Sequence, residues 1–169
     1  GHFKWFTFKA DSSKRFPYKV ADDLYAHRKF TKKVYRSIRN RPLGEKTYKY
    51  SGLSFYLYPE LIHCLSKVPY WSYLDDNFYR PLGAYHLTYF PLNHYSKGDI
   101  IPTEYDSLFR NELIHGSVHD EGAAVMQGMS SNAGLFSNAN DLAKLMQMYL
   151  WKGKYGGKRY IESSTITEF

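Results

Sequence analysis

The sequence is poor in the residues that build disulfides, metal clusters and membrane spans. Cys64 is the only cysteine among 169 residues, which excludes an internal disulfide and a cluster of thiolate ligands. No apolar run reaches the roughly 18 residues that a membrane-crossing helix requires, so we expect no membrane span. Internal repeats and low-complexity tracts are also missing. The expected class is one globular domain or a large piece of one.

Aromatic residues and positive charge are what the sequence has in excess. Tyrosine, phenylalanine and tryptophan make up 18% of the chain, and tyrosine predominates, so many rings should be buried with their hydroxyl groups near water. The net charge is +7, which favours solubility and a weak attraction to polyanions. Because the positive residues are spread along the chain and no nucleic-acid module is recognisable, we expect no nucleic-acid partner. Binding of single strands by the basic aromatic stretches is the weaker alternative.

The spacing of apolar residues predicts a chain dominated by helices. Residues three or four positions apart form apolar faces over residues 20–38, 51–67, 70–79, 122–127 and 139–152, the last of these capped by Ser137 or Asn138. Pro59 either kinks the second of these helices or restarts it. The apolar faces that we expect to be buried include Leu57, Leu61, Cys64 and Leu65 in the second helix, and Leu142, Leu145, Met146 and Tyr149 in the last.

Three segments carry no helical period. Residues 1–19 should form an irregular lead-in, and residues 84–118 a long irregular connection. Residues 155–161 predict a tight turn into a short C-terminal strand. Glu162–Thr165 has the composition of a helix start, but the sequence stops at Phe169, so we expect no helix there and interpret the chain as an internal fragment.

The residues do not contain a complete set of catalytic motifs. A serine nucleophile needs a base within hydrogen-bond reach and donors for the oxyanion. The Gly-x-Ser-x-Gly elbow, Ser-x-x-Lys, Lys-Thr-Gly and His-x-Gly are all absent. We therefore expect no complete active site within these residues.

A metal site is the other chemistry that the sequence could carry. His115 and His119 are four residues apart, with Asp120 adjacent, and on one helix they could share a metal ion. Gly116 and Ser117 argue against such a helix, so hydrogen-bonded structural histidines are the favoured interpretation. We expect neither a metal nor a cofactor.

Several short segments, in order, carry a family pattern. They are Tyr48–Phe55, Asn77–Gly83, Ile101–Glu104, Gly116–Asp120, Asn132–Ala143 and Gly156–Tyr160. Together they resemble the penicillin-recognising serine hydrolases, the beta-lactamase-related family, and in particular a branch common in Bacteroidetes. The resemblance implies an α+β parent fold of the beta-lactamase/transpeptidase type, in which an antiparallel sheet is flanked by helices. Residues 1–169 would be a fragment of that single domain and would cover mainly its helical subdomain.

The resemblance also implies an active site of three motifs. In that family a Ser-x-x-Lys serine is acylated, a Tyr-x-Asn tyrosine acts with the lysine on the nucleophile's proton, and a Lys-Thr-Gly or His-x-Gly strand lines the pocket. The first motif would lie before residue 1 and the third after residue 169. Tyr50 matches the tyrosine and is the one catalytic residue that the resemblance assigns to this chain.

The chain departs from the family pattern at this motif. Gly52 stands where the family has Asn or Asp, and Asn132 stands where close relatives have the His of Gly-His-Ala-Gly-Leu-Phe. Two interpretations stay open. In the first, the parent is a serine hydrolase of acyl esters, amides or cell-wall peptides, and this fragment is inactive alone. In the second, it is a non-catalytic beta-lactamase-like binding or scaffold module.

Localisation and association follow from the same resemblance. It implies a periplasmic or secreted parent. It also implies that a helical subdomain in isolation exposes apolar surface that the rest of its domain would cover. We therefore expect the fragment to self-associate through a patch that includes Trp5, Phe6, Phe8, Leu57 and Leu145.

Overall fold

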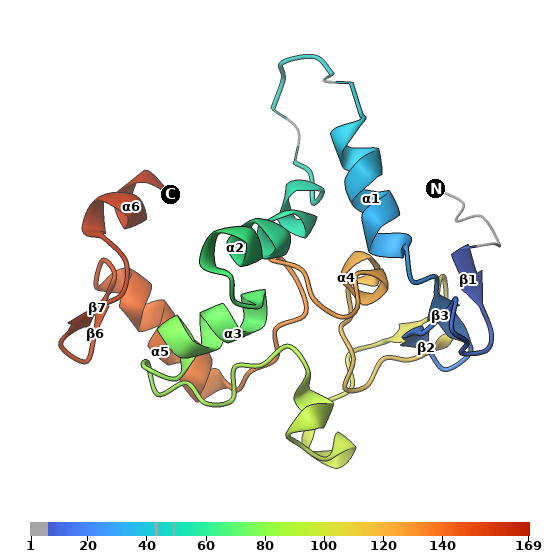
Figure 1. The fold of residues 1–169 in the computed structure, drawn as a ribbon. Coiled ribbons are helices and arrows are strands. Elements are labelled where there is room, and N and C mark those ends of the chain that lie inside the picture. The colour runs from blue at the N-terminus through green and yellow to red at the C-terminus, as the bar shows by residue number, and fades with distance from the viewer. Residues whose placement is uncertain (1–6, 43, 49) are drawn as a thin grey trace. The chain divides into compact units, whose positions relative to one another are not determined.

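The computed structural model describes residues 7–42, 44–48 and 50–169. These residues divide into two compact units, each with its own apolar core. The first unit comprises residues up to Glu60 together with Phe90–Gly134, and the second comprises Leu61–Tyr89 together with Leu135–Phe169. Helices, strands and extended connections alternate along the chain (Figure 1). In the part of the chain that the structure describes, no helix is both long and apolar enough to cross a bilayer.

The first unit begins with a small antiparallel sheet, in the order β1-β3-β2. Its strands are β1 (Phe8–Lys9), β2 (Tyr18–Ala21) and β3 (Leu24–Ala26), and α1 (Phe30–Arg39) follows them (Figure 1). The expected helix over residues 20–38 is therefore wrong in its first half, and part of the expected irregular lead-in is strand.

The physical reason for this difference is a tight turn. Asp22 and Asp23, which resemble the acidic first turn of a helix, instead connect β2 to β3, and Ala21 pairs with Leu24 across them. Lys19 donates to the Asp22 carboxylate at 2.8 Å and fixes the side chain at this turn. The helical part begins only at the buried Phe30, and Arg36 and Arg39 in its last turn complement the helix dipole as expected.

The core of the first unit joins this sheet to a short helix from the far end of the unit. Val20, Ala26 and Phe30 pack with Val118 and with the buried residues of α4 (Glu121–Val125). Asp120 caps α4, because its carboxylate accepts the N–H of Ala123 at 2.6 Å. The predicted helix near residues 122–127 is thus confirmed, and burial of Ala123, Ala124 and Val125 fixes its place.

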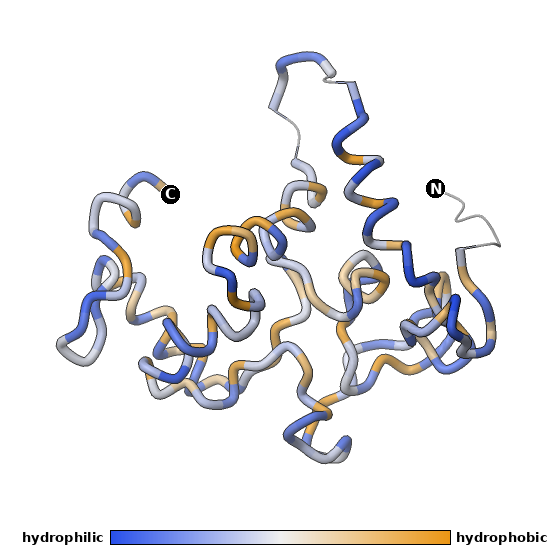
Figure 2. Tube along the Cα trace, in the orientation of Figure 1, coloured by the Kyte–Doolittle hydropathy of each residue, from blue (hydrophilic) through white to orange (hydrophobic). Residues whose placement is uncertain are grey.

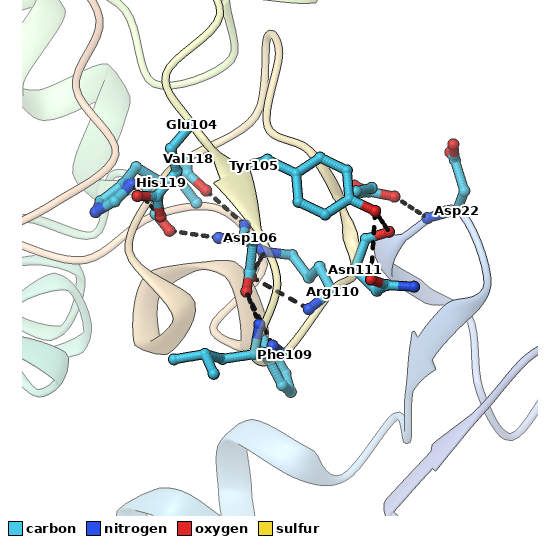
Figure 3. A network of polar contacts seen from close by, with 11 residues as sticks. Asp22, Glu104, Tyr105, Asp106, Phe109, Arg110, Asn111, Val118 and His119 are labelled. Carbon is cyan, nitrogen blue, oxygen red and sulfur yellow. Dashed lines mark hydrogen bonds and ion pairs between the residues drawn. The ribbon is translucent and has the colours of Figure 1, made fainter.

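The connection that precedes α4 is irregular, as expected, but it is held by a buried ion pair. It contains two 3-10 turns, η4 (Pro91–Asn93) and η5 (Lys97–Asp99), and a two-stranded ladder of β4 (Tyr105–Asp106) with β5 (Glu112–Leu113). Arg110 is 7% exposed and donates to the Asp106 carboxylate at 2.8 Å, to the carbonyl of Val118 at 2.7 Å and to the carbonyl of His119 (Figure 3). One guanidinium therefore ties the ladder to the residues that enter α4.

The second unit packs short helices around an apolar core. Its elements are α3 (Tyr70–Leu74), which continues as the π-helical turn η3 (Asp75–Tyr79), then α5 (Ala139–Leu150), β6 (Lys154–Tyr155), β7 (Lys158–Arg159) and α6 (Ser163–Glu168). The core contains Tyr79, Leu82, Ala84, Leu87 and Met148. Helix α2 (Tyr58–Ser66) runs from the first unit into the second after the 3-10 turn η2 (Ser54–Tyr56). Pro59 lies in the first turn of α2, so the helix restarts there and is not kinked.

Several helical boundaries are confirmed and one is wrong. Asn138 caps α5 by accepting the N–H of Asp141 at 2.8 Å, and the turn over residues 155–161 closes the short β6–β7 ladder. The expectation that no helix follows residue 162 is wrong, because α6 forms over Ser163–Glu168.

The expected buried faces of two helices are not buried. Leu61, Cys64 and Leu65 of α2 are exposed, although α2 is among the most apolar segments of the chain (Figure 2). In α5 the fully buried positions are Asp141 and Met148, while Leu142, Met146 and Tyr149 of the expected face are exposed. Within α5 the packed side is therefore rotated from the one that apolar spacing alone predicts.

Asp141 holds the second unit together much as Asp106 holds the first. It is 2% exposed and accepts the backbone N–H of His86 at 2.8 Å, a contact from the His86 ring at 2.8 Å, and the Lys144 ammonium at 2.8 Å. Lys144 also donates to the carbonyl of Gly83. Burial alone would raise the pKa of Asp141, but these hydrogen bonds outweigh it and lower the pKa to about 2.

The two buried carboxylates predict an acid-sensitive fold. Burial of Asp106 is likewise outweighed by hydrogen bonds from Arg110 and nearby backbone N–H groups, which lower its pKa from 3.8 to about 2. A carboxylate whose pKa is lower in the folded state than in the unfolded state stabilises the fold at pH values above its unfolded-state pKa. Each of these carboxylates should therefore contribute about 2 kcal/mol to the free energy of unfolding at neutral pH, and this contribution is lost as the pH falls from about 4 to 2. Urea unfolding at stepped pH should show this loss. Asp106→Asn and Asp141→Asn should each flatten the profile, and an unchanged slope in both variants would contradict the account.

Candidate functional site

The family motif forms a short turn on the surface of the first unit. The hydroxyl of Ser51 accepts the N–H of Leu53 at 3.3 Å, and the carbonyl of Gly52 accepts the N–H of Phe55 at 3.2 Å, so the chain turns directly into η2. Tyr50 precedes this turn and is 72% exposed. The candidate catalytic phenol is therefore accessible to a ligand in the described chain.

A second segment, some eighty residues later, is bonded to this turn. The backbone N–H and the hydroxyl of Ser131 both donate to the carbonyl of Phe55, at 3.2 and 2.9 Å. Ser130 is fully buried, and its hydroxyl donates to Oδ1 of Asn132 at 2.7 Å. These bonds bring residues 130–132 against the motif, and Asn132 remains exposed there.

Gly52 and Asn132, the two departures from the family pattern, are neighbours in space. A Cβ atom added at Gly52 would lie 3.8 Å from Nδ2 of Asn132, which is an ordinary van der Waals contact. The backbone of Gly52 is not among the positive-φ glycines, so neither strain nor space requires a glycine at this position. The glycine is therefore open to substitution without loss of the local fold.

The phenol of Tyr56, four residues after Gly52, lies against Gly122 in the first turn of α4. Burial raises the pKa of Tyr56, and the nearby Asp120 and Tyr50 raise it further. Its phenol oxygen occupies the space that a side chain on Gly122 would need, so the first turn of α4 fits against it only with glycine at this position. The phenol of Tyr56 stays protonated at neutral pH and presents a hydrogen-bond donor close to the motif.

The histidines considered as metal ligands bond elsewhere. His115 contacts the carbonyl of Ile100 through Nε2 at 2.6 Å, and His119 contacts Glu104 through Nδ1 at 3.0 Å (Figure 3). Asp120 is the cap of α4. Among the described residues, no group of three histidine, cysteine, aspartate or glutamate side chains is arranged to hold a metal ion.

Sequence reasoning identified Tyr50, Gly52 and Asn132 but missed the residues that support them. Ser130 and Tyr56 carry no family motif on which the prediction could rest, and their roles come from burial and a non-local contact. One feature of the sequence links Gly52 with Asn132, because both positions depart from the family pattern. The distance between them in the chain gave no reason to connect the two.

The fold of this chain is that of beta-lactamases and penicillin-binding proteins. An octameric penicillin-binding protein homologue from Pyrococcus abyssi matches 81% of this chain and 29% of its own, with a TM-score of 0.58 and 18% identity. A beta-lactamase structure from Bacteroides dorei matches 94% of this chain and 36% of its own, with a TM-score of 0.54 and 14% identity. The α+β class expected from the sequence is confirmed.

Curated relatives add a likeness in sequence. Proteins named D-alanyl-D-alanine carboxypeptidase from Salmonella heidelberg and Salmonella typhi are each 32% identical over 166 residues. The match covers 89% of this chain and 38% of each relative, so the chain spans well under half the length of these proteins. No family model matches the sequence. The fold and the relatives together support a beta-lactamase/transpeptidase-like family of serine hydrolases.

The contact between Tyr56 and Gly122 predicts a specific sensitivity. Gly122→Ala would place a methyl group in the space of the phenol oxygen, so either Tyr56 moves or α4 shifts, and we expect a loss of about 1 to 3 kcal/mol in the free energy of unfolding. The double variant Gly122→Ala with Tyr56→Phe should regain part of that loss. Thermal unfolding measures both, and Gly98→Ala, which has open space around it, is the matched control. A Gly122→Ala variant as stable as the control would contradict this packing.

Proposed function

We propose that this chain is part of a serine hydrolase in which Tyr50 assists the nucleophile. The observation that carries the proposal is the exposed Tyr50 directly before a hydrogen-bonded turn, within a chain 32% identical to proteins named D-alanyl-D-alanine carboxypeptidase. In this reaction a serine hydroxyl attacks the carbonyl carbon of an ester or amide, and its proton passes to the leaving group. Water then hydrolyses the acyl-enzyme and restores the serine.

The serine and the lysine of this mechanism would come from sequence outside residues 1–169. The chain has no Ser-x-x-Lys, Lys-Thr-Gly or His-x-Gly motif, and it spans 38% of its curated relatives. On this proposal the chain is the helical part of one beta-lactamase-like domain and is inactive alone. The Bacteroides dorei neighbour supports a Bacteroidetes-type branch.

The proposed substrate is a small acyl ester, an amide or a cell-wall peptide. The name of the curated relatives supports this proposal, because it implies that those proteins act on peptides that end in D-alanyl-D-alanine. A carbonyl carbon flanked by an oxygen or nitrogen leaving group is the common chemistry of these substrates.

A second function is favoured by one residue. Gly52 removes the side chain that the family motif supplies, and a protein that has lost the chemistry could keep the cleft as a binding or scaffold module. This alternative belongs to a different class, because it predicts ligand binding without acylation. Labelling by a fluorescent penicillin separates the two classes, since only an active serine forms the covalent adduct.

The proposed role of Tyr50 predicts the outcome of a direct assay. In the whole protein, Tyr50→Phe should lower kcat for release of D-alanine from a D-alanyl-D-alanine peptide by about 100-fold or more, because a proton-transfer group is lost. Tyr48→Phe is the matched control, since Tyr48 is 95% exposed and only two residues away. The isolated chain should not exceed the buffer rate. Turnover by the isolated chain that Tyr50→Phe abolishes would refute its proposed fragment status, and full activity in Tyr50→Phe would refute the role.

We also propose that the isolated chain self-associates through the outer face of α5. Leu142, Met146, Tyr149 and Leu150 recur at helical spacing and are 44%, 46%, 44% and 76% exposed. Of the patch expected from the sequence, Leu57 is exposed, whereas Phe8 packs against the core of the first unit and Leu145 against that of the second. Trp5 and Phe6 lie outside the described residues.

Association should therefore depend on the outer face of α5. A second copy can cover this face by a symmetric contact, which is the commonest closed arrangement. Light scattering at micromolar concentrations should give a dimeric mass for the isolated chain and a monomeric mass for the double variant Met146→Glu with Leu150→Glu. Leu108→Glu, which changes a leucine that is 93% exposed in the first unit, should leave the dimer intact. A monomeric parent chain would contradict the proposal.

A further inference from the structure

The carboxamide of Asn132 occupies the space beside the motif where Gly52 offers no side chain. Its Nδ2 atom lies 3.8 Å from the position that a Cβ of residue 52 would take. A residue with a side chain at position 52 would direct its polar group into this same region. The nearest polar group there now comes from a segment eighty residues away in the sequence.

The carboxamide of Asn132 is hydrogen-bonded at its other end. The Ser130 hydroxyl donates to Oδ1 of Asn132 at 2.7 Å, and the amide lies with its oxygen toward Ser130 and its NH₂ group toward Gly52. Ser130 is itself fully buried, and its backbone N–H bonds to the carbonyl of Ala133 at 3.1 Å. The anchor is therefore rigid, while Asn132 is exposed and its NH₂ group can reach a ligand.

The segment that carries Asn132 is hydrogen-bonded to the motif. Ser131 donates twice to the carbonyl of Phe55, three residues after Gly52, at 3.2 and 2.9 Å. Asn132 is thus tied to the turn that directly follows the exposed Tyr50.

We propose that Asn132 supplies a ligand-binding hydrogen-bond donor beside Gly52. Its NH₂ group would donate a hydrogen bond to a carbonyl oxygen of a ligand that lies against Tyr50. An amide hydrogen bonds only as a donor through nitrogen, so the site would select ligands with an ester or amide carbonyl at this point and disfavour ligands that present a donor. This inference rests on the proposed hydrolase function for the turnover of the ligand, but the hydrogen bond does not depend on turnover.

Four versions of the whole protein test this proposal, namely the parent, Asn132→Ala, Gly52→Asn and the double variant. Asn132→Ala should lower kcat/KM for a D-alanyl-D-alanine peptide by about tenfold or more, because a ligand oxygen loses its donor. Gly52→Asn in that background should restore the value to within about threefold, since the backbone and the space at residue 52 accept a side chain. A purely structural role for Asn132 predicts no such rescue.

Calorimetric binding of benzylpenicillin to the same four proteins separates this inference from the proposed function. If the parent shows no turnover and no acylation, the hydrolase proposal fails, and the inference then predicts the same pattern of loss and rescue in the dissociation constant. Asn132→Ala with unchanged binding and unchanged kcat/KM overturns the inference. A loss that Gly52→Asn does not restore overturns it as well. Leu108→Ala, far from the motif in sequence and highly exposed, controls for nonspecific loss.

Discussion

The carbonyl oxygen of Phe55 is the point on which the candidate site depends. It accepts two hydrogen bonds from Ser131, and these bonds hold the segment that carries Asn132 against the motif. Two donors on one carbonyl satisfy both of its lone pairs and leave little freedom for either segment. The turn over residues 51–55 and the segment 130–132 are therefore bonded to each other, although they are far apart in the chain.

Within each unit, a buried carboxylate holds a connection in place where helices and strands are short or absent. Asp106 receives hydrogen bonds from Arg110 and from backbone N–H groups, and Asp141 receives them from His86 and Lys144. In each case a long connection is tied to a helix or to the entrance of a helix. A charge that is buried and fully bonded costs desolvation but specifies one arrangement, and its removal would leave partner groups unsatisfied. This is how a chain with short strands and short helices keeps its connections in place.

Helix starts were predictable from the sequence where a capping residue or a proline marks them. Asn138, one of two candidate caps, begins α5, and Pro59 lies in the first turn of α2, which is one of the two outcomes expected for it; the chemistry of both residues acts within one turn of the helix. The prediction of secondary structure failed where one local pattern fits two structures. Asp22 and Asp23 fit a helix start as well as a hairpin turn, and only pairing with β3 decides between them.

The apolar faces of α2 and α5 were also predicted incorrectly, since spacing shows which residues share a face but not which face is packed. For the site, the family motif gave Tyr50 and the departures at Gly52 and Asn132. The contact between the last two was not predictable, because it depends on a non-local hydrogen bond to Phe55.

The central claim is that the carboxamide of Asn132 faces Gly52. The most direct test is nuclear Overhauser spectroscopy on the isotope-labelled chain, with the Asn132 side-chain NH₂ signals assigned through their loss in Asn132→Asp. The account predicts a cross-peak between these NH₂ protons and the α-protons of Gly52, and the cross-peak should weaken in Ser130→Ala, which frees the amide oxygen. A folded chain that shows the Ser131 amide contact to residue 55 but no cross-peak between Asn132 and Gly52 would contradict the account.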